Sequence, residues 1–184
     1  MAGCAFFGGN TIEVSDEEIQ KQLLDSFKDK GQATLARLNQ TPLQKACSAA
    51  DATGKPLSDS QRSSLEKAAL EAVKYPVDSQ YLGDWKNGEK IAQTGTGFQF
   101  SDDPKKEAGG NCYACHQLAP QELAYGNIGP SLYQYAKLRG NSEEIMKYTW
   151  GKIWNSHAYN ACSAMPRFGA EGILTEAQIK HVMA

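Results

Sequence analysis

The chain has 184 residues, a length that suits one domain or a small domain with an extension. Its formal net charge of −2 gives no electrostatic reason to expect a nucleic-acid partner. No run of about 18 apolar residues occurs, so the sequence predicts no membrane-spanning helix. A globular protein outside the nucleic-acid-binding and membrane-spanning classes is therefore expected.

The sequence begins Met1-Ala2-Gly3-Cys4. Ala-Gly-Cys resembles the end of a bacterial lipoprotein signal, in which the cysteine becomes the acylated first residue. The charged and apolar regions that should come before it are missing from the chain. Two interpretations of Cys4 therefore stay open, acylation of the native protein and an unmodified thiol in a flexible tail.

Residues 15 to about 75 have the pattern of consecutive helices. Apolar residues recur at helical spacing, and we expect the first helix to stop at Gly31 and the last at Pro76. Each helix begins with a capping box, in which two side chains satisfy free backbone N–H groups reciprocally. The three boxes are Ser15 with Glu18, Thr41 with Gln44, and Ser58 with Gln61.

Residues 77–87 form a connecting segment, and after it the sequence contains longer loops and shorter predicted helices. The pattern predicts a short helix over 86–93, a glycine-rich loop to 110, helices over 131–140 and 142–154, and a polar loop over 155–172. Thr175 with Gln178 caps a last helix. Strand signals are weak, so the expected fold class is all-α, with an N-terminal helical extension over 1–85 and a second domain over 86–184.

Cys112, Cys115 and His116 form a C-x-x-C-H motif. Two thiols at this spacing match the two vinyl groups of a porphyrin, and the next residue then offers an imidazole to the iron. A zinc site would need a second ligand pair, and a thioredoxin-like dithiol would need a βαβ pattern. Neither occurs, so the motif predicts one covalently bound haem c with His116 as an axial ligand.

Gly129-Pro130-Ser131-Leu132 follows His116 by thirteen residues. The carbonyl oxygen of Pro130 is expected to accept a hydrogen bond from the imidazole N–H that faces away from the iron. Such a bond orients the ring and makes it a better donor to the metal. The alternative is an ordinary Gly-Pro turn.

Met165 is the candidate for the sixth iron ligand. It lies in a loop, and Pro166 favours an extended backbone at Met165. His157 is the rival ligand, although an exposed loop histidine is the simpler interpretation. Arg167 either pairs with a haem propionate or is a solvated or partner-facing charge, and both interpretations stay open. Of the other candidate ligands, Met146 suits core packing, and Met183 and His181 suit the surface.

Five cysteines are an odd number, and the haem motif uses two of them. Cys4, Cys47 and Cys162 remain. Haem is attached through thioether bonds outside the bacterial cytoplasm, where thiols are oxidised. A disulfide among these three residues is therefore expected, in a periplasmic protein.

Four segments of the C-terminal half together resemble SoxX, the small monohaem subunit of the SoxAX cytochromes of bacterial thiosulfate oxidation. The resemblance covers about residues 86–184. Its M-P-R-F-G segment and G-I-L-T ending are much more specific than C-x-x-C-H. The segments are Gly110–His116, Gly126–Leu132, Asn160–Gly169 and Gly172–Ile179.

The resemblance implies a class I cytochrome c-like haem domain over 86–184, with His116 and Met165 as iron ligands. It also implies a periplasmic complex with a larger SoxA-like haem subunit. That complex, an L-cysteine S-thiosulfotransferase, oxidatively couples thiosulfate to a SoxY-type carrier protein. The sulfur chemistry would belong to the partner, so this chain would hold no catalytic residue and would pass electrons to a downstream acceptor cytochrome.

Two features depart from a minimal SoxX, the N-terminal extension and Cys162. We expect Cys162 to form a disulfide with Cys47 that ties the extension to the Met165 loop, and a buried free thiol is the alternative. The alternative function is a free-standing soluble periplasmic electron carrier, which would purify without a partner. A haem enzyme or gas sensor would need an open sixth position, against which the Met165 loop argues.

Overall fold

The computed structural model describes residues 14–184, so Cys4 and its expected acylation lie outside the described part. Helices are the regular structure of these residues, and Lys30 and Ala33 form an isolated β-bridge. The predicted all-α class is confirmed. The helices are α1 (Asp16–Ser26), η1 (Leu35–Leu38), α2 (Pro42–Thr53), α3 (Asp59–Glu71), α4 (Trp85–Gln93), η2 (Cys112–Ala114), α5 (Tyr135–Arg139), α6 (Glu143–Trp154), η3 (Ser156–Ala158) and α7 (Glu176–Met183).

The predicted capping boxes are confirmed at the starts of α1, α2, α3 and α7. In each box the first side chain accepts a hydrogen bond from the backbone N–H three residues later, and the later side chain reaches back. These bonds satisfy N–H groups that have no partner inside the helix. Local sequence therefore sets where these four helices begin.

Three helices are shorter than the pattern predicts. α3 ends at Glu71, with Ala72 as its C-cap, before the predicted stop at Pro76. α1 ends at Ser26, because Phe27 adopts an extended backbone with φ −106° and ψ 151°. Gly31, the predicted stop, lies in the following turn with φ +55°. α5 begins only at Tyr135, because Gln134 takes a left-handed conformation with φ +55°. A left-handed residue cannot continue a right-handed helix, so the segment before α5 stays irregular.

Residues 73–184 form a helical body around one hydrophobic core. Trp150 and Ile179 are completely buried at its centre, and the indole Nε1 of Trp150 donates to the carbonyl oxygen of Lys74 at 2.8 Å. Val73 and Tyr81 belong to the same core cluster. Both precede the predicted boundary at residue 85, so the end of the extension contributes to the core of the second domain.

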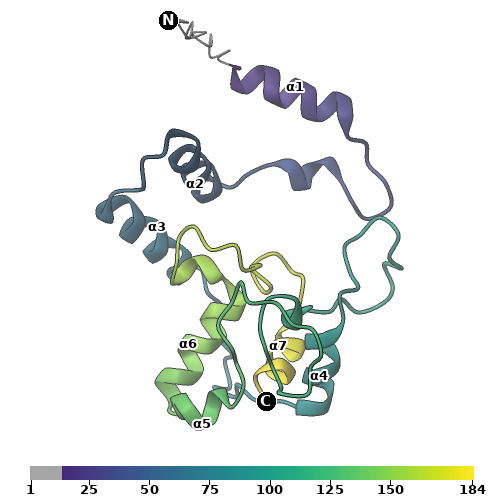
Figure 1. The fold of residues 1–184 in the computed structure, drawn as a ribbon, viewed down its shortest axis with the longest axis vertical. Helices are drawn as coiled ribbons and strands as arrows, with labels where there is room; N and C mark the ends of the chain where they lie inside the picture. Colours follow the sequence, from purple (N-terminus) through teal and green to yellow (C-terminus); the bar gives the residue numbers. More distant parts are fainter. Residues whose placement is uncertain (1–13) are drawn as a thin grey trace, which may run out of the picture.

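α4 and α7 cross in close contact within this body (Figure 1). A Cβ atom at Gly88 would lie only 2.0 Å from the carbonyl oxygen of His181. The backbones of α4 and α7 can therefore come this close only because residue 88 has no side chain. The backbone N–H of Asp84 donates to Nδ1 of His181 at 2.9 Å. His181 is half-buried, and its ring joins the two helices.

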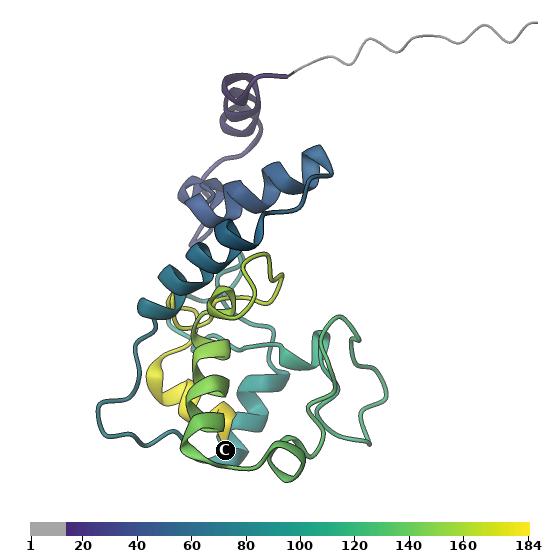
Figure 2. The ribbon, with the colours of Figure 1, turned by 90° about the vertical axis from the view of Figure 1, so that its left-hand side faces the viewer.

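Residues 14–72 form an N-terminal arm that extends away from the body (Figures 1 and 2). None of the residues in α1, α2 or α3 is buried. The arm contacts the loop before the C-x-x-C-H motif through two cation–π pairs. The Nζ atom of Lys30 lies 4.1 Å from the ring centroid of Phe100, and the guanidinium carbon of Arg37 lies 4.9 Å from that of Phe98.

Across residues 14–184, the helices are too short or too polar to cross a lipid bilayer.

Candidate functional site

The C-x-x-C-H motif folds into a single helical turn that begins in η2. The backbone N–H groups of Cys115 and His116 both donate to the carbonyl oxygen of Cys112, at 3.1 and 2.9 Å. Both cysteines are free thiols and half-buried. The two thiols and the imidazole are therefore carried on one turn, which is the arrangement that attachment to a porphyrin requires.

The Cys112 thiol does not have the properties of a nucleophile or a metal-binding thiolate. Burial raises its pKa to about 11, so it is protonated at neutral pH. Reactive and redox-active cysteines instead have lowered pKa values. Within residues 14–184, no group of three or more His, Cys, Asp or Glu side chains could hold a metal ion.

The imidazole of His116 is oriented by the loop that follows it. Its Nδ1 atom lies 2.7 Å from the carbonyl oxygen of Pro130, which is the contact that the sequence predicts. With Nδ1 as the donor, the ring carries its proton on the side of Pro130. No residue between 14 and 184 forms a hydrogen bond with Nε2, so its lone pair is available to a metal.

Two glycines bring the loop after the motif against the motif turn. A Cβ atom at Gly129 would lie 2.2 Å from Cε1 of His116, and one at Gly126 would lie 1.8 Å from the carbonyl oxygen of Ala114. The backbone N–H of Gly129 also donates to the carbonyl oxygen of Cys115 at 2.8 Å. Close backbone contact therefore fixes the plane of the imidazole ring.

Several large apolar and aromatic side chains between residues 113 and 138, the stretch that starts in the motif, are exposed. Together with the two free thiols and the imidazole nitrogen of the motif, exposed apolar side chains suit a large, mostly apolar group that carries a metal. They are Tyr113, Leu123, Tyr125, Ile128, Tyr133 and Leu138, with exposed fractions from 36% to 104%.

Met165 lies in the loop between η3 and α7 with its backbone held on both sides. The hydroxyl of Ser156 donates to the carbonyl oxygen of Met165 at 2.6 Å. The N–H of Met165 donates to the hydroxyl oxygen of Ser163 at 3.2 Å. The side chain is half-buried and packs against the hydrophobic core. Iron ligation by Met165 stays a prediction.

His157 is not the exposed loop histidine that the sequence suggests. Only 6% of its surface is exposed, and its Nε2 atom lies 3.2 Å from the carbonyl oxygen of Ser163. Burial lowers the pKa of His157, and the positive charge of Arg167 lowers it further. His157 is therefore a neutral, buried residue that holds the Met165 loop, and the expectation of exposure is wrong.

Arg167 forms an ion pair within the same loop. Its guanidinium lies 2.8 Å from Glu171, and 17% of its side chain is exposed. The interpretation as a freely solvated charge is therefore wrong. Arg167 and Arg37 both line a cavity of about 500 Å³ between the arm and the body. Pairing of Arg167 with a haem propionate stays a prediction.

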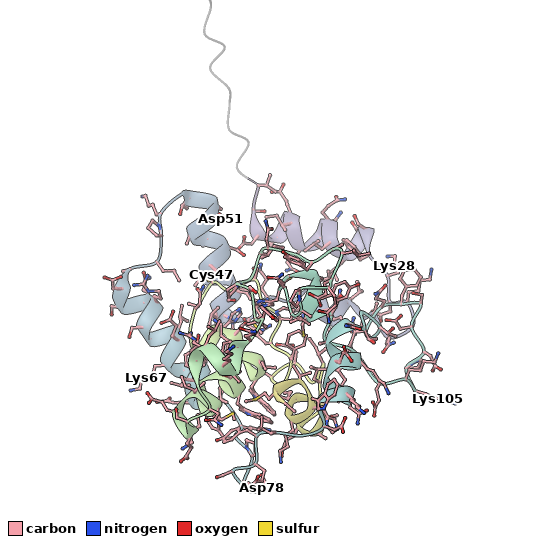
Figure 3. The ribbon with its side chains drawn as sticks, turned by 60° about the horizontal axis from the view of Figure 1, so that its bottom comes forward. Lys28, Cys47, Asp51, Lys67, Asp78 and Lys105 are labelled. Atoms are coloured by element: carbon pink, nitrogen blue, oxygen red, sulfur yellow. A yellow bond between two sulfur atoms is a disulfide. The ribbon has the colours of Figure 1, made fainter. Side chains whose placement is uncertain are left out.

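Cys47 and Cys162 form a disulfide, the pairing that the sequence predicts. The two sulfur atoms are 2.03 Å apart, and the residues are 115 positions apart in sequence. The bond joins α2 of the arm, where Figure 3 labels Cys47, to the Met165 loop.

Glu66 is a residue that sequence reasoning missed. Its carboxylate accepts a hydrogen bond from the backbone N–H of Ala161 at 3.1 Å. The two residues are 95 positions apart, so no local pattern indicates the contact.

No family model matches the chain. The chain is 34% identical over 174 residues to an uncharacterized lipoprotein of Aquifex aeolicus (strain VF5). The match covers 94% of this chain and 81% of the relative. Identity at this level over nearly the whole length shows common descent and a shared fold. The chain therefore belongs to the family of this Aquifex aeolicus lipoprotein.

Proposed function

We propose that the chain is a monohaem c-type cytochrome, with haem attached to Cys112 and Cys115 and with His116 as an axial ligand. The contact between Nδ1 of His116 and the carbonyl oxygen of Pro130 carries the proposal. A carbonyl oxygen that accepts the proton on Nδ1 leaves Nε2 as an oriented donor, and metal-ligating histidines typically donate their other ring N–H in this way. The two free thiols on the same turn also favour a haem ligand over a histidine with only a structural role.

The bound haem would supply one-electron redox chemistry, and the residues of the chain set how that group is held. The motif turn would provide the thioether attachments. Gly129 and Pro130 would fix the imidazole plane and its proton. Exposed apolar side chains in the segment after the motif would be available to cover the macrocycle.

Met165 is the proposed second protein ligand of the haem iron. The two hydrogen bonds to its backbone, from Ser156 and to Ser163, support a fixed loop conformation. The rival His157 is poorly suited, because its Nε2 atom already faces the carbonyl oxygen of Ser163. Methionine ligation would give a higher potential than bis-histidine ligation, which suits an electron carrier.

We further propose that the chain is the SoxX-like electron-transfer subunit of a SoxAX complex. It would receive electrons from a larger SoxA-like haem subunit, where thiosulfate is coupled to the SoxY-type carrier, and would pass them to an acceptor cytochrome. The sequence resemblance over residues 86–184 supports this proposal. The α4–α7 crossing beside the motif turn is also compatible with a class I cytochrome c-like domain.

We propose a periplasmic location with a lipid anchor on Cys4. The name of the Aquifex aeolicus relative, a lipoprotein, supports a lipid-anchored protein outside the cytoplasm. Mass spectrometry of the native N-terminus tests the anchor. An acylated Cys4 is expected, and an unmodified Cys4 would contradict it.

Purification of the native protein tests the proposed complex. The chain should co-purify with a larger haem subunit, and thiosulfate should reduce its haem only when that subunit is present. If the chain purifies alone and binds no added SoxA-like subunit, a free-standing electron carrier is the better description.

A further inference from the structure

The N-terminal arm holds the loop that carries Met165 from outside the body. α3 of the arm lies along η3, next to the start of this loop (Figure 2). Glu66 accepts the hydrogen bond from the N–H of Ala161, and the side-chain amide of Asn155 lies 3.5 Å from the carbonyl oxygen of Ala69. The disulfide adds a covalent link at Cys162. Three links from two helices of the arm therefore converge on the first half of the loop.

The carboxylate of Glu66 accepts a hydrogen bond from the buried backbone N–H of Ala161, which has no access to water. Ala161 is only 1% exposed, so its backbone N–H needs a partner within the protein. A half-buried carboxylate makes a charge-assisted hydrogen bond, which is stronger than a neutral one. Loss of the Glu66 carboxylate would leave this buried N–H unsatisfied and would destabilise the loop conformation.

Inside the loop, neighbouring residues extend these links to Met165. Ser156 follows Asn155 and is completely buried, and its hydroxyl donates to the carbonyl oxygen of Met165. Ser163 follows Cys162, and its hydroxyl oxygen accepts from the N–H of Met165. The residues that fix the backbone of Met165 are therefore next to residues that the arm holds.

We propose that Glu66 and the Cys47–Cys162 disulfide are positioning residues for Met165, so that the arm controls access to the sixth coordination position. This inference rests on the proposed function, in which Met165 is an iron ligand. With the arm links intact, the loop keeps the thioether in place. Without them the loop opens more often, and an external ligand competes more successfully for the position.

Imidazole titration of the oxidised, full-length holoprotein measures this opening. We expect Glu66→Ala to bind imidazole about tenfold more tightly than the wild type, a change that corresponds to about 1.4 kcal/mol. Glu66→Gln keeps an oxygen acceptor, so its affinity should change less than about threefold. The matched control is Glu71→Ala, which removes an exposed carboxylate from the same helix, where Glu71 pairs with Lys67 at 3.9 Å.

The double variant Cys47→Ser/Cys162→Ser should shift imidazole affinity in the same direction as Glu66→Ala. Wild-type affinity in both variants would overturn the inference, as would an equal shift in Glu71→Ala. Met165→Ala separates this failure from failure of the ligand assignment. If Met165→Ala binds tightly while Glu66→Ala does not, only the positioning role is overturned. If Met165→Ala binds as the wild type does, the ligand assignment is wrong and the inference falls with it.

Discussion

Gly129 lies directly against the imidazole ring of His116. A Cβ atom at Gly129 would be 2.2 Å from Cε1 and 2.5 Å from Nδ1 of that ring. Nδ1 of the ring also lies 2.7 Å from the carbonyl oxygen of Pro130, and a rotation of the ring would break this contact. The glycine therefore defines where the imidazole plane lies.

Gly129→Ala should lower the free energy of unfolding by about 1–3 kcal/mol, the usual range for overpacking. The methyl group would push the ring away from the loop and disturb its orientation toward the haem. Denaturant unfolding of the holoprotein measures the change. Gly95→Ala is the control, because its Cβ would meet only the side chain of Asn111, at 3.3 Å. Equal stability of Gly129→Ala and the wild type would contradict the close contact.

Met165→Ala should abolish the sulfur-to-iron charge-transfer band of the oxidised protein and lower the reduction potential. Met146→Ala is the matched control, since Met146 packs against the same core and its loss removes similar packing. Absorption spectra and redox titrations of both variants test the assignment. Survival of the band in Met165→Ala, or its loss in Met146→Ala, would show that Met165 is not the ligand.

Gly88→Ala should destabilise the protein, although alanine normally favours a helix over glycine by about 0.5–1 kcal/mol. The added Cβ would lie 2.0 Å from a backbone oxygen of α7 and would force α4 and α7 apart. A loss of about 1–3 kcal/mol in the free energy of unfolding is expected. Asn87→Ala, at an exposed neighbouring position, should change that energy by less than about 0.5 kcal/mol. A gain in stability for Gly88→Ala would be inconsistent with the observed crossing.

His157 should make stability depend on pH. Burial holds the pKa of His157 in the folded protein below its ordinary value of 6.5, so the unfolded chain binds a proton more readily. The free energy of unfolding should therefore fall as the pH drops below 6.5 and toward the folded-state pKa. Denaturant unfolding across this range, compared with His157→Asn, measures the effect. An unchanged pH dependence in His157→Asn would rule out this residue as its source.

Local features of the fold could be predicted from the sequence, whereas contacts between distant segments could not. The capping boxes were readable because both members of each pair are three residues apart. The end of α1 and the start of α5 were harder to predict, because Phe27 and Gln134 are non-helical although neither is glycine or proline. The short helix η1 likewise has no cap that the sequence could indicate.

The candidate site divides in the same way. C-x-x-C-H and Gly-Pro are contiguous motifs, so the Pro130 contact with His116 could be expected. The burial of His157 and the contact of Glu66 with Ala161 depend on how α3 packs against η3. That packing joins segments separated by about 95 residues, and a single sequence does not show which distant residues meet.

Covalent haem attachment is the most direct test of the central claim. The full-length protein, matured in cells that attach haem c, should retain haem after denaturation and acid extraction. Peptide mass spectrometry should place that haem on the peptide that contains Cys112 and Cys115, through two thioether bonds. Protein recovered from the same cells with free thiols at both cysteines would contradict the proposed cytochrome.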